Sequence, residues 1–284
     1  MIHKPVLLSE LIQYLKPKPG ENFIDATVGM AGHALAILSK TAPGGKVLGI
    51  DYDRKALERL AVSDKRLVKY LGNFKNLKEI AKETEFKNIS GIYFDLGLGS
   101  WQIEDQSFGL SFQKDMPLSM RISSENDQQT ARDIVNKWPK DELTKIFREY
   151  GEIRRPHQIA EKIINYREKN KIQSTLELVK ATGVQNPAVL AKIFQALRIV
   201  VNDELENLKT ALREAVEILK QNGKIAVISY HSGEDRIVKN FFKDMQREGI
   251  LKTLTKKPVI ATIEEIKENP RSRSAKLRVA ERAK

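Results

Sequence analysis

Short apolar runs alternate with helically spaced apolar residues over the first hundred positions of the chain. Four runs are typical of strands, at 22–26, 46–51, 66–71 and 90–96. Helical spacing lies between them, at 33–40, at 54–61 and in a stretch that ends near Glu83. Strands that alternate with helices favour a mostly parallel sheet covered by helices on both faces.

The alternation stops between about Glu104 and Glu206, where strand signals are nearly absent. Stripes of apolar residues at helical spacing replace them, which indicates packed helices. Ser174 and Glu177 form the pattern of a capping box, and Gly183 is placed to end the helix that they begin.

Strand and helix patterns return after this helical region. A long helix over 205–219 is expected to close at Asn222 and Gly223, and the remaining pattern predicts a strand at 224–230, a helix at 235–246 and a strand at 276–281. The chain is therefore expected to form a discontinuous α/β domain, residues 1–103 and 207–284, interrupted by a helical insertion at 104–206.

Composition narrows the classes of function. The 284 residues include 49 Lys and Arg against 37 Asp and Glu, a net charge of +12. Such an excess favours a polyanionic partner, nucleic acid first, although a solvated basic surface is the alternative. Cysteine is absent, which excludes disulfides, thiolate metal sites and a thiol nucleophile. We expect no metal site.

Nothing in the sequence indicates a membrane or an export signal. The chain has no apolar run of about 18 residues, the length that a membrane span needs. The first ten residues lack the charged, apolar and small-residue order of a signal peptide. The expected location is cytoplasmic.

A glycine loop follows the first predicted strand and opens a helix. Gly29 and Gly32 let the backbone approach a ligand, and Asp51 ends the next strand 19 residues after Gly32. This spacing favours nucleoside binding over a plain tight turn. The G-x-x-G pattern counts against a dinucleotide, which needs a tighter G-x-G turn.

Three carboxylates are predicted at strand ends: Asp25, Asp51 and Asp95. The carboxyl ends of parallel strands border the ligand crevice of an open α/β sheet. A cluster of acidic groups there suits a cationic cofactor such as S-adenosylmethionine better than a pyrophosphate.

Three further segments carry polar chemistry. Residues 95–100 leave a strand with two glycines, which exposes Asp95, although an N-cap with a flexible turn is an equal alternative. Residues 229–236 gather Ser, His, Glu and Asp side chains around His231, which could instead be a structural histidine. Residues 269–278 interleave Arg and Ser, as phosphate contacts do and as an exposed charged edge also would.

These motifs together resemble the RsmH (MraW) family, the bacterial small-subunit ribosomal RNA cytosine-N4 methyltransferases. The resemblance runs nearly end to end. It rests on HxPVLLxE at 3–10, IDxTxGxxGH at 24–33, DLGxxS at 95–100, FGLSF at 108–112, PLxMR at 117–121, FQALRIxVNDEL at 194–205, HSxEDRIVK at 231–239 and NPRSRSAKLR at 269–278.

The resemblance implies a class I methyltransferase fold with a helical insertion that recognises substrate. It implies S-adenosylmethionine as cofactor and 16S ribosomal RNA within the small subunit as partner, with the oligomeric state open between monomer and homodimer. The implied cofactor contacts are Gly29, Ala31, Gly32, His33, Asp51, Phe74, Asp95 and Gln102.

The mechanism we expect is direct in-line transfer to the exocyclic amine. Methylation at cytosine C5 normally uses a cysteine adduct, which this chain cannot form. The candidate catalytic residues are Asp95, or a backbone carbonyl of residues 96–100, to accept from the amine, and Ser100, His231 and Asp235 to orient the base or remove the proton. The candidate phosphate contacts are Arg121, Arg198, Arg236, Arg271 and Arg273.

The chain departs from the family pattern at four positions. Ala31 stands where glycine is usual, Gly99 where serine is usual, and Ser119 and Ser123 replace aspartates. Three alternatives therefore stay open: a non-catalytic RNA-binding or assembly protein, an NAD-dependent oxidoreductase, and methylation of another RNA atom such as a ribose hydroxyl.

Overall fold

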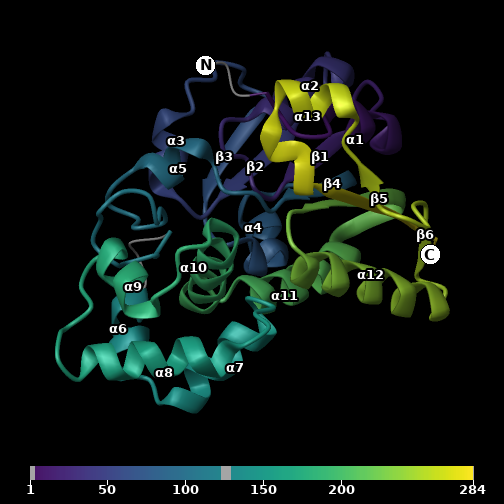
Figure 1. Cartoon of the computed structure of the whole chain (residues 1–284). Coiled ribbons are helices and arrows are strands. Elements are labelled where there is room, and N and C mark those ends of the chain that lie inside the picture. The colour runs from purple at the N-terminus through teal and green to yellow at the C-terminus, as the bar shows by residue number, and fades with distance from the viewer. Residues whose placement is uncertain (1–3, 123–128, 284) are drawn as a thin grey trace. The chain divides into compact units, whose positions relative to one another are not determined.

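The computed structural model describes residues 4–122 and 129–283 of the chain (Figure 1). His3 and Ser123, which the sequence motifs include, lie outside these ranges. The chain divides into two compact units, one formed by Met1–Gly97 with Leu205–Lys284 and the other by Leu98–Glu204. The first is called the α/β unit and the second the helical unit.

The α/β unit is built on one sheet in the order β3-β2-β1-β4-β5-β8-β6, with β7 paired to β8. Strands β1 to β5 pair in parallel, whereas β8 runs antiparallel to β5, β6 and β7. The strands are β1 Asn22–Asp25, β2 Val47–Asp51, β3 Leu67–Leu71, β4 Ile89–Asp95, β5 Leu219–Ser229, β6 Leu251–Thr253, β7 Val259–Ile260 and β8 Lys276–Arg282. The expected mostly parallel α/β sheet is confirmed.

Helices cover both faces of this sheet, because successive strand residues point to opposite sides. Ile24 and Phe94 pack on one face with α4, α11 and α12, while Phe23 and Tyr93 pack on the other with α1 and α2 (Figure 1). The helices of the unit are α1 Leu8–Leu15, α2 Gly32–Thr41, α3 Arg54–Arg59, α4 Leu77–Glu83, α11 Glu204–Ile218, α12 Ser232–Arg247 and α13 Ile263–Glu268, with 3-10 turns η1 Phe74–Asn76 and η2 Pro270–Ser274.

The helical unit has its own apolar core, centred on fully buried side chains such as Phe147 and Ile193. Among its described residues there is no strand, only an isolated bridge between Pro117 and Ser174. Its helices are α5 Ser100–Glu104, α6 Ala131–Lys137, α7 Lys140–Glu149, α8 Pro156–Arg167, α9 Thr175–Thr182 and α10 Pro187–Asn202. The predicted capping box is confirmed at the start of α9, and Gly183 ends that helix in a left-handed conformation.

The predicted end of the long helix at Asn222 and Gly223 is wrong. Helix α11 ends at Ile218, and β5 begins with Leu219, which is 1% exposed and pairs with Ile89 of β4. Asn222 has a φ of 60° inside a register shift of β5. Burial of Leu219 on the sheet therefore outweighs continuation of the helix. The short β6, β7 and α13 also escaped the sequence pattern.

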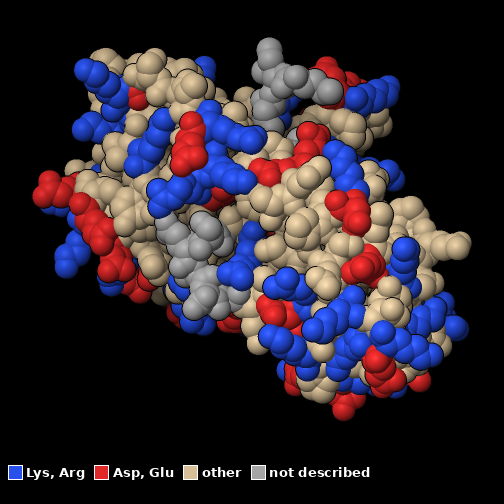
Figure 2. Space-filling view, turned by 90° about the vertical axis from the view of Figure 1, so that its left-hand side faces the viewer, with Lys and Arg blue, Asp and Glu red and all other residues tan. Residues whose placement is uncertain are grey.

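The excess of positive charge belongs to the α/β unit. Between Leu98 and Glu204 the sequence has 16 Lys and Arg and 15 Asp and Glu, so the remainder holds 33 of the 49 cations and 22 of the 37 anions. On the face drawn in Figure 2 the two signs are interspersed. Within the described ranges, no helix is both long and apolar enough for a membrane crossing.

Candidate active site at the carboxyl edge of the sheet

Three neighbouring parallel strands end in aspartate. Asp51 ends β2, Asp25 ends β1 and Asp95 ends β4, and β1 lies between the other two. The chain crosses from β3 at one side to β4 at the other, so this edge is the topological switch point where open α/β sheets bind ligands. The predicted placement of the three residues at strand ends is confirmed.

The glycine loop lies over this edge and leads into α2. Gly29 has a φ of 46°, and its N–H donates to Asp51 Oδ2 at 2.8 Å. Ala31 has a φ of 59°, a conformation that favours glycine, at the position where the family pattern has one. A Cβ on Gly32 would come within 2.3 Å of Pro5, so the N-terminal segment closes tightly on the loop.

Asp51 ties the loop to the ends of β2 and β3. Its Oδ1 accepts from the N–H of Asp53 at 2.9 Å, and its backbone carbonyl accepts from the N–H of Gly72. A carboxylate offers about four lone-pair sites, so Asp51 keeps acceptors for ribose hydroxyls beyond its two N–H partners. Phe74, which follows Gly72 closely, packs edge-on against Phe94 and supplies an apolar surface.

Asp25 differs from the expectation that all three carboxylates face the ligand. It is only 2% exposed, and its Oδ1 accepts from the N–H of Thr27 at 3.1 Å. Burial raises the pKa of Asp25 to about 8, so this carboxyl is mostly neutral at pH 7. The acidic character of the edge therefore comes from Asp51 and Asp95.

Asp95 is held from three sides. Its N–H donates to Thr27 Oγ1 at 2.7 Å, and its Oδ1 accepts from the Tyr230 hydroxyl at 2.7 Å. The buried His33 ring donates from Nε2 to the Val6 carbonyl, because a carbonyl can only accept. Its Nδ1 lies 3.7 Å from Asp95 Oδ2, so a proton on Nδ1, or a donor shared by both atoms, completes this contact.

The contact between Asp95 and Tyr230 depends on a glycine. A Cβ on Gly97 would lie 2.7 Å from the Tyr230 ring, so only a residue without a side chain lets the ring reach Asp95. Burial raises the pKa of Tyr230 far above its usual range, which keeps the hydroxyl a donor.

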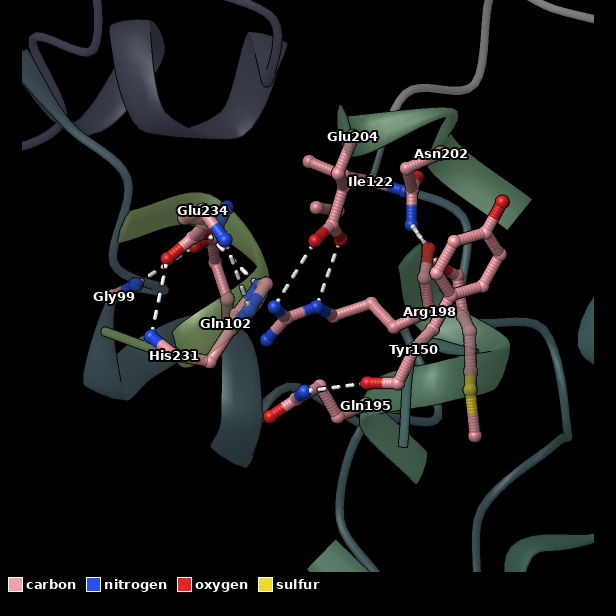
Figure 3. Close-up of polar contacts among 11 residues, drawn as sticks. Gly99, Gln102, Ile122, Tyr150, Gln195, Arg198, Asn202, Glu204, His231 and Glu234 are labelled. Carbon is pink, nitrogen blue, oxygen red and sulfur yellow. Dashed lines mark hydrogen bonds and ion pairs between the residues drawn. The ribbon is translucent and has the colours of Figure 1, made fainter. Parts of the chain in front are cut away.

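His231 is engaged at both ring nitrogens. As the N-cap of α12 it accepts from the Glu234 N–H at Nδ1, and its Nε2 lies 3.2 Å from Glu234 Oε1. The other oxygen of Glu234 accepts from the N–H groups of Tyr230 and His231, as Figure 3 shows for the histidine and the glutamate. The geometry fits a fixed, buried histidine better than a free proton carrier.

Asp235 lies in a bidentate ion pair with Arg278. The oxygens of Asp235 accept from Arg278 Nε at 2.6 Å and Nη2 at 3.2 Å, and Lys276 Nζ lies 3.8 Å away. The side chains of Asp235 and Arg278 are 14% and 8% exposed. The contact joins the first turn of α12 to β8.

In the helical unit, the candidate cofactor residue Gln102 braces its own helix. Its Oε1 accepts from the N–H of Gly99 at 2.8 Å (Figure 3). A Cβ on Gly99 would come within 2.8 Å of Trp101 Nε1, so this packing suits glycine where the family pattern has serine. Ser100 begins α5, and its side chain is outside what the structure describes.

The candidate RNA contacts have different surroundings. Arg198 pairs bidentately with Glu204 at 2.8 Å and 3.0 Å (Figure 3), while the Arg121 N–H donates to Ser119 Oγ. In the α/β unit, Arg236 is exposed in the first turns of α12, and η2 carries the exposed Arg273 and the half-buried Arg271.

Thr27, Tyr230 and Glu234 hold the candidate residues in place and were not singled out from the sequence. Thr27 lies inside the glycine-loop motif, and Tyr230 and Glu234 flank His231, so the motif density was the available signal.

Comparison with known proteins agrees with this site. The sequence model of the MraW methylase family matches residues 1–283. The chain is 42% identical over 308 residues to the ribosomal RNA small subunit methyltransferase H of Carboxydothermus hydrogenoformans, covering 99% of this chain and 97% of that protein. It is 41% identical to the protein of the same name from Persephonella marina, with 99% of each chain covered, and 38% identical to that of Brevibacillus brevis, with 99% and 98% covered. With its full length matched and the loop and strand ends in place, the chain belongs to the MraW methylase family.

Proposed function

We propose that this chain transfers a methyl group from S-adenosylmethionine to the exocyclic N4 of a cytidine in small-subunit ribosomal RNA. The observation that carries the proposal is the full-length similarity to small-subunit rRNA methyltransferases, on a chain whose candidate cofactor edge is intact. The cofactor supplies an electrophilic methyl group on a sulfonium.

The residues of the carboxyl edge fit this cofactor. Asp51 has acceptors left for the ribose hydroxyls, and Phe74 offers an apolar surface to the adenine. Asp95 and the Nδ1 atom of His33 present acceptors 3.7 Å apart, which suits the cationic amino end of the cofactor. Gly29, Ala31 and Gly32 bring the backbone close, and Gln102 is the contact proposed from the helical unit.

Asp95 is the proposed acceptor for the target amine. The lone pair of that amine is delocalised into the ring, so a carboxylate that accepts an N–H raises its electron density as the new bond forms. The Tyr230 hydroxyl fixes one oxygen of Asp95 and leaves the other for the reaction. Transfer is in line, with amine and methyl held at about 3 Å.

Ser100, His231 and Asp235 were the other candidate catalytic residues. We propose that His231 shapes the loop after β5 through Glu234, and that Asp235 acts through its ion pair with Arg278. Ser100 stays a candidate for orienting the base. The target cytidine must be unstacked or already exposed, and Arg121, Arg236, Arg271 and Arg273 stay proposed phosphate contacts.

Cofactor affinity is expected to fall in acid because of Asp51. Burial raises the pKa of Asp51 to about 6. Above pH 6 the carboxylate is ionised and accepts the ribose hydroxyls. Below pH 6 it is protonated, and affinity should fall by up to about tenfold per pH unit. Calorimetric titration of S-adenosylmethionine between pH 5 and 8 measures this effect. Asp51→Asn should bind weakly with a flat profile, and an unchanged acid fall in that variant would contradict the assignment.

The function is tested by methyl transfer from labelled S-adenosylmethionine to small ribosomal subunits that lack the modification. Nucleoside mass spectrometry of the RNA is expected to show N4-methylcytidine, or its 2′-O-methylated form where the ribose is already modified. A methyl group on ribose alone, or no transfer by a protein that binds the cofactor, would overturn the proposal. Titration with NAD tests the oxidoreductase alternative.

A further inference from the structure

A groove lies between α11 and α12 on the α/β unit and shares no residue with the carboxyl edge described above. It has a volume of about 210 Å³ and is lined by Lys209, Leu212, Arg213, Ile237, Asn240 and Phe241. Each helix contributes residues spaced three and four apart, so the groove follows the facing sides of the two helices. Figure 1 shows these helices side by side.

The floor of the groove is apolar and its rim is polar. Leu212 is buried in the core beneath the sheet, and the half-buried Ile237 and Phe241 pack against that core. Arg213 and Asn240 are exposed at the rim. An aromatic ring beside an amide and a guanidinium is the set of groups that stacks a nucleobase and binds its edge or phosphate.

The groove is also electropositive. Its lining contains no carboxylate, and among the described residues Arg213 has no hydrogen-bond or ion-pair partner. On α12, the exposed Lys239 and Lys243 flank Asn240.

The acidic groups of the two helices are engaged elsewhere. Glu206 pairs with Lys209, and Glu217 pairs with Lys78 of α4. On α12, Asp235 pairs with Arg278 and Asp244 with Arg247. The uncompensated charge of the groove is therefore positive.

We propose that this groove binds a single-stranded segment of the substrate RNA, with a base against Phe241 and phosphate at Arg213. The proposal rests on the proposed function, since it names a second contact for the same RNA. The volume is below the roughly 300 Å³ of ordinary small-molecule pockets, which favours one base of a longer chain over a free cofactor. The groove adds affinity for RNA and takes no part in the methyl transfer step.

The test compares Arg213→Ala and Phe241→Leu with the control Arg247→Ala, which removes an exposed cation of α12 outside the groove. Affinity for a fluorescent single-stranded RNA of about 12 nucleotides is measured by anisotropy at several salt concentrations. Arg213→Ala should weaken binding about threefold to fivefold and reduce the salt slope by about 0.7. Phe241→Leu keeps an apolar side chain and should weaken binding about tenfold.

Cofactor affinity, melting temperature and methyl transfer by the unaltered protein are measured beside these variants. If the unaltered protein methylates small subunits while both groove variants bind RNA as Arg247→Ala does, the groove proposal is overturned and the function stands. If the unaltered protein transfers no methyl group, the proposed function fails whatever the groove binds. A groove that instead joins two copies would show as a dimer that Arg213→Ala dissociates without change in RNA affinity, and this also overturns the proposal.

Discussion

Replacing Asp95 with Ala should lower kcat for methyl transfer by about 10²–10³-fold, the usual effect of removing a polar group that stabilises a transition state. Asp95 is the carboxylate that the sheet, Thr27 and Tyr230 fix at the carboxyl edge. The measurement is single-turnover transfer to unmodified small subunits at saturating cofactor. Cofactor affinity is measured separately, because Asp95 is also a proposed cofactor contact.

Two companion variants separate chemistry from folding. Asp95→Asn keeps an oxygen to accept from the Tyr230 hydroxyl, so the protein should melt normally and still lose transfer. Tyr230→Phe removes the hydroxyl that orients Asp95 and should lower kcat by about tenfold, as expected for one hydrogen bond to a charged group. Near-normal turnover of folded Asp95→Ala would remove Asp95 from the mechanism.

Replacing Asp235 with Leu should destabilise the protein rather than block the chemical step. The change leaves Arg278, which is 8% exposed, without its bidentate partner and leaves Lys276 close by. Loss of one partner of a buried ion pair costs about 3–5 kcal/mol of unfolding free energy. Urea unfolding measures this loss, and transfer by the fraction that is still folded should persist.

The double variant Asp235→Leu with Arg278→Met decides between the two roles of Asp235. An apolar pair of similar volume can replace a buried ion pair at little cost, so most of the lost stability should return. Transfer should return with it if Asp235 only joins α12 to β8. A stable double variant without transfer would instead make Asp235 the proton carrier that its position in the motif suggested.

Much of the fold could be predicted because its signals are local. The alternation of apolar runs and helical stripes located β1 to β4 and the helical unit, and the capping box located α9. The glycine loop and the strand-end aspartates follow from spacing within one strand and turn. The end of α11 failed, because the pairing of Leu219 with Ile89 joins positions far apart in the chain.

The sequence by itself determined the α/β class, the helical insertion and the glycine loop, and its motif order resembled one family. Only the tertiary structure decided what the polar side chains of these motifs do. It buries Asp25, joins Asp95 to Tyr230 across 135 residues, and joins Asp235 to Arg278 across 43. Local spacing sets which residues share a strand end or a helix face. Burial and ion pairing depend on which distant strand or helix packs against them, and these set the charge and role of each group.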